Sequence, residues 1–208
     1  LFLALFFSTT AHSALDRIID FALLDEMGLF HQLSRYQHKD VVVLMSFDQS
    51  CQLMPAMLAE YDDIVSEFSS NGIEFLLIDS EGLERETLAS LRLNVPILED
   101  SGQLVSESLG FERSGEVLML NPERLSVYFR GPVSPDLRTS LSSMESIQDT
   151  LELESRGCKI EYPDKVAHGL NTPDYATDVA PIIIENCVAC HNQGGVGPFA
   201  FDSYVMVL

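Results

Sequence analysis

Two long apolar runs, VVVLMSF at residues 41–47 and IEFLLI at residues 73–78, restrict the fold of this chain more than any other feature. Neither run has the regular apolar–polar alternation of a half-exposed strand, so both are expected to be strands buried on two faces. Between them, apolar residues recur at helical spacing from Met54 to Phe68. A strand, a helix and a second buried strand form a βαβ unit, which predicts a parallel core sheet.

The segments on either side of this unit add further elements to the sheet. In chain order they are a hairpin at residues 21–33, a helix near 83–91, a short strand after Pro96, a hairpin at 115–131 with its turn at Asn121-Pro122, and a helix at 135–151. The alternation of strands and helices predicts an α/β fold, in which the second hairpin adds antiparallel strands.

The charge of the chain narrows its choice of partners. Its 208 residues include 32 acidic and 12 basic side chains, which give a formal net charge of −20. Such a charge argues against binding to nucleic acid or to an anionic membrane surface. A basic or neutral redox partner is compatible with it.

The first residues, LFLALFF followed by small residues up to Ala14, resemble the end of a secretory signal peptide. The apolar stretch is too short to span a bilayer, so no stable membrane span is expected. We interpret residues 1–14 as the remnant of such a signal and expect an exported, periplasmic protein. A buried apolar strand is the alternative. Export permits both disulfides and covalent haem.

The order of the predicted elements resembles the thioredoxin fold. More narrowly, it resembles the redoxin branch, the alkyl hydroperoxide reductase and thiol-specific antioxidant (AhpC/TSA) family. The segments that carry the resemblance are DFALLDEMGLFHQL before the first core strand, Cys51 between strand and helix, NVPILED, VYFRG and RGCKI. The resemblance covers about residues 16–164 and implies a thioredoxin-like redoxin domain at residues 16–162.

Cys51 is the first candidate catalytic residue, because a helix N-terminus stabilises a thiolate. The surrounding residues depart from the patterns of the related enzymes. A peroxiredoxin would carry a proline and a threonine where this chain has Leu44 and Asp48, and a thioredoxin would carry a second cysteine in place of Met54. Neither peroxidase activity nor dithiol exchange is supported in full by these residues.

Cys158 is the candidate disulfide partner of Cys51, since two lone cysteines of one domain tend to pair in an oxidising compartment. The bond would be structural or a slow redox couple. In the catalytic case Cys51 attacks and Cys158 resolves, while Pro96 presents a backbone carbonyl to the incoming chain. The resemblance implies a cis bond before Pro96, although an edge-strand proline explains this residue equally well.

Copper handling is a third possibility for this domain, because several of its side chains are soft or borderline metal ligands: Cys51, Met54, Met57, His31 and His38. Against copper, both methionines fall on the apolar stripe of the predicted helix, where a methionine usually packs in the core.

The chain changes character after about residue 162. Residues 163–178 are polar and contain proline and glycine, which indicates a linker, and residues 179–186 predict a short apolar helix. The sequence ENCVACHNQGG follows directly. This motif has two cysteines separated by two residues and a histidine directly after the second, which is typical of covalent haem attachment. The attachment would use Cys187 and Cys190, with His191 as the iron ligand.

A bare disulfide or a metal corner is the alternative to haem at this motif, but a zinc site would need a second ligand pair, and the chain has none after it. The flanking residues resemble the start of cytochrome c-like modules found beside redoxin domains. We therefore interpret residues 179–208 as a partial haem-binding segment. Met206 is the only methionine after this motif. It would either bind the haem iron as the distal ligand or pack in a core.

In some proteins of that arrangement, a copper type II, ascorbate-dependent monooxygenase domain follows. The resemblance thus implies more protein beyond Leu208, and copper only there. We expect an exported redox protein that combines thiol or peroxide chemistry with haem c, and a redox partner protein or a small-molecule oxidant or thiol as its reaction partner. The alternative is a scaffold domain without thiol catalysis, in which haem is the sole active centre.

Overall fold

The structure is a computed structural model that describes residues 16–68, 72–170, 173–197 and 200–201. The predicted signal remnant at residues 1–14 and Met206 lie outside the described residues. The chain divides into two compact units, one ending at Tyr162 and the other beginning at Pro163.

The first unit is built on a mixed sheet with the strand order β5-β4-β3-β6-β7-β8. Strands β3, β4 and β5 run parallel, β6 is antiparallel to both β3 and β7, and β8 runs parallel to β7. The predicted parallel core with added antiparallel strands is confirmed. The bounds of the strands are β3 Val41–Phe47, β4 Ile73–Asp79, β5 Ile97–Leu98, β6 Glu116–Asn121, β7 Ser126–Pro132 and β8 Leu151–Glu152.

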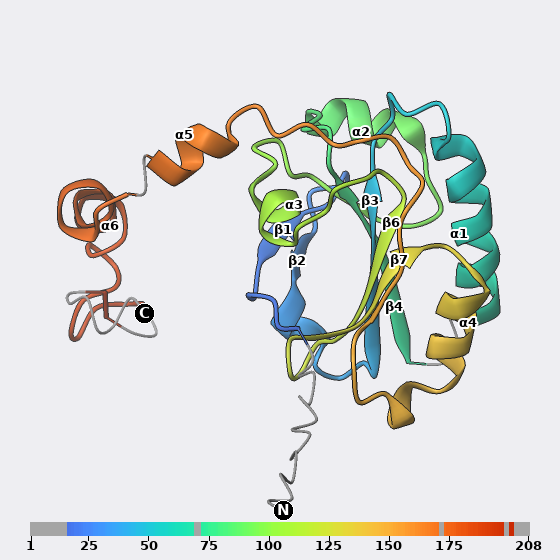
Figure 1. The fold of residues 1–208 in the computed structure, drawn as a ribbon. Helices are drawn as coiled ribbons and strands as arrows, with labels where there is room; N and C mark the ends of the chain where they lie inside the picture. The colour runs from blue at the N-terminus through green and yellow to red at the C-terminus, as the bar shows by residue number, and fades with distance from the viewer. Residues whose placement is uncertain (1–15, 69–71, 171–172, 198–199, 202–208) are drawn as a thin grey trace, which may run out of the picture. The chain divides into compact units, whose positions relative to one another are not determined.

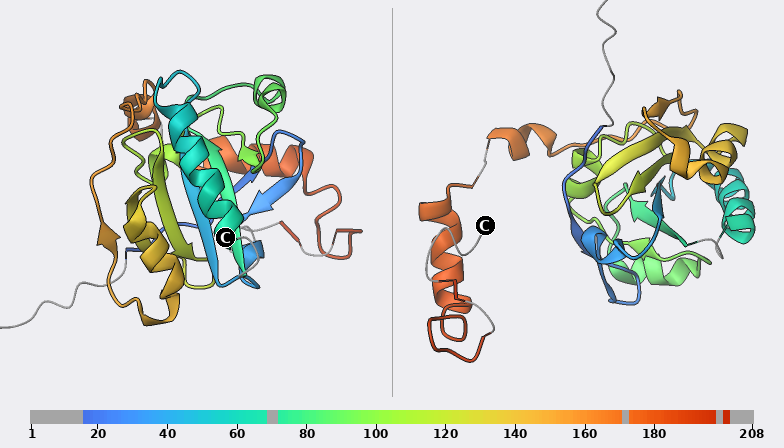
Figure 2. Two further views of the ribbon diagram at one scale, coloured as in Figure 1. Left: turned by 90° about the vertical axis from the view of Figure 1, so that its right-hand side faces the viewer. Right: turned by 90° about the horizontal axis from the view of Figure 1, so that it is seen from below.

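Other elements cover the two faces of this sheet (Figure 1). Helices α1 and α4 pack on one face, and the view onto that side in Figure 2 shows α1 lying along the strands. The predicted N-terminal hairpin, β1 and β2, lies on the other face together with α3. The bounds are α1 Met54–Phe68, α2 Arg85–Leu91, α3 Leu104–Ser108, α4 Pro135–Ser142, β1 Ala22–Leu24 and β2 Phe30–Gln32.

Burial on both faces explains why the central strand is apolar throughout. Side chains of β3 point alternately to the two faces, so Val41 and Val43 join the core under α1 and α4 while Val42 and Leu44 join the core under the hairpin. None of these four side chains is exposed. The loss of apolar–polar alternation in the sequence is therefore a direct consequence of two covered faces.

A predicted helix over residues 135–151 is shorter in the structure. Helix α4 ends at Ser142, a 3-10 turn follows at Met144–Ser146, and Leu151 belongs to β8, paired with Phe129 of β7. Met144 and Ile147 still pack against the core, but without a continuous helix. Pairing of Leu151 with the edge of the sheet replaces the last helical turns that the apolar spacing predicted.

The second unit is more helical than the sequence indicated, because the segment predicted as a linker contains helix α5, Lys165–Leu170, and a π-helical turn at Tyr175–Val179. The Asp174 side chain caps this turn by accepting from the backbone N–H groups of the two residues after Tyr175. Helix α6, Ala180–Asn186, matches the predicted apolar helix. Among the described residues, no helix is long and apolar enough to cross a membrane.

Candidate functional site

A disulfide joins Cys51 to Cys158, two residues 107 positions apart whose Cα atoms are 5.7 Å apart. Cys51 lies in the loop between β3 and α1, where its backbone N–H donates to the carbonyl of Asp48 (3.2 Å) and its own carbonyl accepts from the N–H of Met54 (2.9 Å). The bond thus connects the N-terminal end of α1 with the last segment of the first unit.

Asp48 shapes the loop that carries Cys51. Its Oδ1 atom accepts from the backbone N–H of Ser50 (2.9 Å) and from the Ser50 hydroxyl (2.6 Å). Both bonds belong to an Asx-type turn, in which a carboxylate replaces a backbone acceptor. Asp48, which stands where a peroxiredoxin carries threonine, therefore has a structural role, which is to bend the chain between β3 and α1.

The loop before β6 packs against the disulfide from the sheet side. The Gly115 N–H donates to the carbonyl of Ser46 at the end of β3 (2.8 Å), and the Ser46 hydroxyl donates to the carbonyl of Arg113 (2.8 Å). Gly115 has a φ of +76°, and a Cβ at this residue would overlap the sulfur of Met57 on α1. Glycine is required here both by the backbone conformation and by the close approach of Met57.

We call residues 155–160 the return segment, because they bring the chain back to this loop after β8. Ser114 holds the segment through its N–H, which donates to the Cys158 carbonyl (2.9 Å), and through its hydroxyl oxygen, which accepts from the Cys158 N–H (3.0 Å). A Cβ at Gly157 would lie 1.6 Å from the Ser114 carbonyl oxygen. These contacts fix the backbone on both sides of Cys158.

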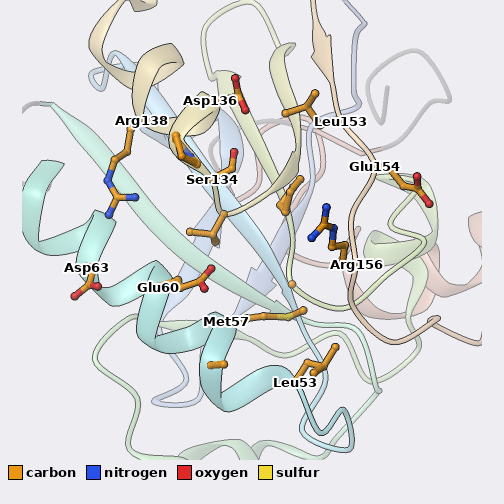
Figure 3. Close-up of a pocket in the computed structure, with 15 residues that line it drawn as sticks. Leu53, Met57, Glu60, Asp63, Ser134, Asp136, Arg138, Leu153, Glu154 and Arg156 are labelled. Carbon is orange, nitrogen blue, oxygen red and sulfur yellow. The ribbon is translucent and has the colours of Figure 1, made fainter.

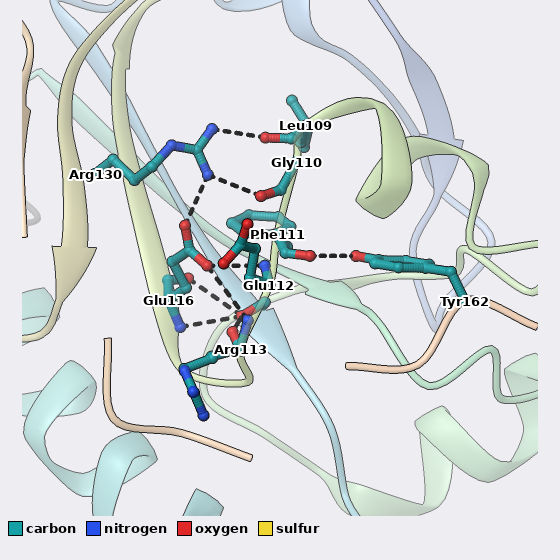
Figure 4. Close-up of polar contacts among 9 residues, drawn as sticks. Leu109, Gly110, Phe111, Glu112, Arg113, Glu116, Arg130 and Tyr162 are labelled. Atoms are coloured by element: carbon teal, nitrogen blue, oxygen red, sulfur yellow. Dashed lines mark hydrogen bonds and ion pairs between the residues drawn. The ribbon is translucent and has the colours of Figure 1, made fainter. Parts of the chain in front are cut away.

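A partly buried ion pair contacts the same loop (Figure 4). Arg130 on β7 contacts the carboxylate of Glu116 at 2.7 Å and donates to the carbonyls of Leu109 and Gly110. Glu116 is 5% exposed, and its second oxygen accepts from backbone N–H groups of the loop. Each buried charge is thereby compensated, as a buried ion pair requires. The Tyr162 hydroxyl donates to the neighbouring Phe111 carbonyl (2.8 Å), and burial raises the pKa of this phenol.

A cavity of about 900 Å³ lies between α1 and the segment that leads to Cys158, and neither Cys51 nor Cys158 lines it (Figure 3). Leu53, just before α1, and Met57 of α1 lie on one side of it, and Leu153 and Arg156 lie on the other. Its polar lining is mostly acidic: Glu60, Asp63, Asp136 and Glu154, against Arg138 and Arg156. The guanidinium of Arg138 pairs with Glu67 at 2.9 Å, which leaves the cavity with a negative rim.

Pro96 does not have the expected geometry. No cis peptide bond occurs among the described residues, so the predicted cis bond before Pro96 is wrong. The Pro96 carbonyl accepts from the N–H of Leu77 in the ladder between β4 and β5 (2.9 Å), so this ladder already uses the carbonyl predicted to face an incoming chain. The alternative expectation, a proline on an edge strand, matches the structure, since β5 is an edge of the sheet.

Ser114, which holds Cys158, and Ser46 and Gly115, which hold the loop before β6, were not predicted from the sequence. The signal for one of them was present in the sequence, because a glycine directly before a strand often marks a positive φ or a close backbone approach. No local pattern identifies Ser46 or Ser114, since their partners are distant in sequence.

The structure does not bring the proposed copper ligands together. Cys51 and Met54 belong to the core under α1, whereas the hairpin that carries His31 packs on the opposite face. The His31 ring contacts Asp25 (3.0 Å) and the Tyr36 hydroxyl (2.5 Å). Among the described residues, no group of three histidine, cysteine or acidic side chains could hold a metal ion. With Cys51 in a disulfide, its thiolate is not available as a copper ligand.

A buried carboxyl group lies at the end of the neighbouring strand β4. Asp79 is not exposed, and its Oδ1 atom accepts from the N–H of Glu81 (3.1 Å). Burial raises the pKa of Asp79 to about 7, and the backbone hydrogen bonds from Glu81 and Leu83 only partly oppose this effect.

In the second unit, Cys187 and Cys190 are free thiols at the C-terminal end of α6. The backbone N–H of His191 donates to the Cys187 carbonyl (2.9 Å), so the two cysteines and the histidine share one helical turn. A Cβ at Gly197 would lie 2.6 Å from Nδ1 of His191, and the Phe201 ring stacks on the imidazole with centroids 4.7 Å apart. This donor set fits covalent haem, because both thiols are reduced and adjacent, and the backbone approaches the Nδ1 side of the ring.

Comparisons with known proteins agree with this fold. The model of the AhpC/TSA family matches residues 14–128, and no curated protein matches the chain. Similar solved structures include a hypothetical protein from Sinorhizobium meliloti 1021 (TM-score 0.63, 16% identity, covering 72% of this chain and 94% of that one). A thiol-disulfide oxidoreductase from Bacteroides fragilis has a TM-score of 0.55 at 17% identity, with 62% and 99% covered.

A putative thiol:disulfide interchange protein DsbE from Chlorobium tepidum has a TM-score of 0.52 at 14% identity, with 65% of this chain and 96% of that one covered. At these identities the structures show a common fold and no more. The family match is independent of them and spans more than half of the sequence. The chain therefore belongs to the AhpC/TSA family, and its first unit is a thioredoxin-like redoxin domain.

Proposed function

We propose that the first unit is a thiol–disulfide oxidoreductase whose redox-active group is the Cys51–Cys158 bond. The observation that carries the proposal is the place of this bond: it joins the loop before α1 to a half-buried cysteine two residues after Arg156, which lines a cavity of about 900 Å³. A purely structural disulfide needs no such access. The negative rim of the cavity favours a basic thiol-bearing protein or a cationic small thiol as the reaction partner.

In the reaction, a dithiol partner supplies two electrons. One partner thiolate attacks the disulfide and forms a mixed disulfide, and the second partner thiol then displaces the enzyme sulfur. The partner leaves as a disulfide, while Cys51 and Cys158 become thiols and take up the two protons that the partner loses. Peroxide reduction is less supported, since Leu44 and Asp48 replace the proline and threonine that a peroxiredoxin carries.

Native-state reduction tests this proposal. The folded, oxidised protein is incubated with dithiothreitol, and newly formed thiols are alkylated and counted over time. We expect the two thiols of Cys51 and Cys158 to appear before any loss of native structure in far-UV circular dichroism. The Cys51→Ser/Cys158→Ser variant is the control for alkylation of Cys187 and Cys190. A bond that is reduced only when the protein unfolds would establish a structural disulfide and the scaffold alternative.

We further propose that the second unit binds haem c through Cys187, Cys190 and His191. Two reduced thiols in one helical turn and a histidine packed against Gly197 and Phe201 support this proposal. Bound haem would supply single-electron transfer, with His191 as the iron ligand. Copper, if the protein uses it, would belong to a domain beyond Leu208.

Expression in a host that attaches haem in the periplasm tests this second proposal. We expect a pyridine haemochrome spectrum whose absorbance survives acid–acetone extraction, because the haem is bound through thioether bonds. The Cys187→Ser/Cys190→Ser variant should lose the extraction-resistant absorbance. If the unaltered chain carries no covalent haem, the motif is a disulfide or metal corner. N-terminal sequencing of the exported protein would show whether residues 1–14 are removed.

A further inference from the structure

We propose that an external thiol attacks this disulfide at Cys158, so that Cys158 forms the mixed disulfide and Cys51 is the leaving sulfur. The inference rests on the thiol–disulfide exchange proposed above. It reverses the roles that the sequence resemblance implied, in which Cys51 attacks and Cys158 resolves.

The first argument is the difference in exposure between the two cysteines. Cys51 is 3% exposed and belongs to the core under α1, whereas Cys158 is half-buried and packs against that core from outside. A thiolate attacks a disulfide sulfur along the S–S axis, from the side opposite the leaving sulfur. Attack on Cys51 would therefore come from within the core, while attack on Cys158 comes from the surface.

The second argument concerns the leaving sulfur. Cys51 lies three residues before Met54, the first residue of α1, a helix of 15 residues, and the Cys51 carbonyl accepts from the Met54 N–H. The partial positive charge at this end of the helix stabilises a thiolate on Cys51. Cys158 has no helix behind it, because it lies in the extended return segment held by Ser114. Burial of Cys51 in the apolar core opposes this effect, so the greater exposure of Cys158 is the stronger reason for attack at that sulfur.

The third argument is that Cys158 is held in place by contacts that do not involve its sulfur. Its N–H and carbonyl both bond to Ser114, and the neighbouring Gly157 packs against the Ser114 carbonyl. After attack, the backbone can therefore remain in position while Cys158 carries the mixed disulfide.

The step balances as follows. The partner thiolate donates an electron pair to the Cys158 sulfur, a new S–S bond forms there, and the Cys51–Cys158 bond breaks. Cys51 takes the electron pair of the broken bond and leaves as a thiolate, which then accepts a proton from water. In the reverse direction, Cys51 attacks the mixed disulfide and releases the partner thiol.

The test uses cysteamine as a cationic thiol probe on the oxidised full chain. Cysteamine reacts with disulfides and not with the free thiols of Cys187 and Cys190. The reaction is stopped early with acid, free thiols are alkylated under denaturing conditions, and the labelled cysteines are identified by peptide mass spectrometry. We expect at least ten adducts on Cys158 for each one on Cys51. In 6 M guanidinium chloride, where both sulfurs are accessible, the two adducts should form in comparable amounts.

The outcomes separate the two proposals. Adducts mainly on Cys51 under native conditions would overturn this inference and leave thiol exchange intact. No adduct on either cysteine under native conditions, with normal labelling in guanidinium, would overturn the exchange function itself. Single-cysteine variants provide a second measurement on the Cys187→Ser/Cys190→Ser background. There Cys158, the thiol that remains in the Cys51→Ser variant, should react with an aromatic disulfide reagent at least tenfold faster than Cys51, the thiol that remains in the Cys158→Ser variant.

Discussion

Gly157 allows the return segment to approach the loop before β6, because any larger residue would collide with the Ser114 carbonyl. The collision is with backbone, and Ser114 is held to Cys158 by hydrogen bonds from its N–H and to its hydroxyl oxygen. A side chain at this residue therefore forces the two segments apart.

The Gly157→Ala variant should lower the free energy of unfolding by about 2–3 kcal/mol, a typical cost of overpacking. It should also speed native-state reduction of the Cys51–Cys158 bond, since the return segment is displaced. The matched control is Gly102→Ala, where a Cβ would meet only the Leu104 side chain at 3.7 Å. Urea unfolding and thiol counting measure the two effects, and equal stability of the two variants would contradict the steric argument.

Asp79 gives the fold a pH dependence of known sign. Its pKa is raised from 3.8 to about 7 by burial, so the folded protein holds a proton that the unfolded chain releases between these values. The contribution of Asp79 to stability is therefore complete below pH 4 and is lost as the pH rises through 7. The slope in this window is about −1.4 kcal/mol per pH unit.

In the Asp79→Asn variant this slope should disappear, because asparagine does not titrate. Urea unfolding at several pH values between 4 and 8 measures it. Asp136→Asn, a change at an exposed carboxyl group on α4, is the control and should retain the slope of the unaltered protein. An unchanged slope in Asp79→Asn would show that another group carries the pH dependence.

At the scale of elements, Tyr61 connects one helix to two strands. It lies on α1 and is completely buried, and its hydroxyl contacts the carbonyls of Val43 on β3 (3.0 Å) and Leu76 on β4 (3.2 Å). The phenol thus ties the crossover helix to both strands of the βαβ unit.

The Tyr61→Phe variant should lose about 1–2 kcal/mol of stability, since it leaves this buried polar contact unmade while keeping the ring. Its effect should appear mainly as faster hydrogen exchange in β3 and β4. The control is Tyr162→Phe, which removes a hydrogen bond to Phe111 outside the βαβ unit of β3, α1 and β4. This variant should leave hydrogen exchange in β4 unchanged. Faster hydrogen exchange only in strands other than β3 and β4 would contradict this role of the Tyr61 hydroxyl.

Sequence patterns predicted the helices and strands in which burial repeats at a regular period. They failed where the structure of a segment depends on its pairing with residues far away in sequence. The runs at β3 and β4 and the stripe of α1 were predicted because burial repeats along each of them. The prediction that the last helix continues to Leu151 was wrong, because the local spacing of apolar residues does not show that Leu151 pairs with Phe129. At the site, Cys51 was recognisable from its place between strand and helix, but Ser114 acts on Cys158 through hydrogen bonds between residues far apart in sequence.

For the molecule as a whole, the disulfide constrains the unfolded chain over 107 residues. Closing a loop of this size removes conformational entropy from the unfolded state and stabilises the fold by about 4–5 kcal/mol in the chain-entropy account. The Cys51→Ser/Cys158→Ser variant should therefore unfold at markedly lower urea concentration than the oxidised protein. Reduced unaltered protein is the control and should resemble the variant, whereas a stability equal to that of the oxidised protein would contradict the account.

The same loop has a mechanical consequence. When the ends of the chain are pulled apart, the residues between Cys51 and Cys158 cannot be extended while the bond is intact, although β3, which precedes Cys51, can be drawn out of the sheet. Reduction of the bond would release roughly 350 Å of additional extension, at about 3.3–3.6 Å per residue. In a single-molecule force experiment, the redox state of one bond would thus be read as a length.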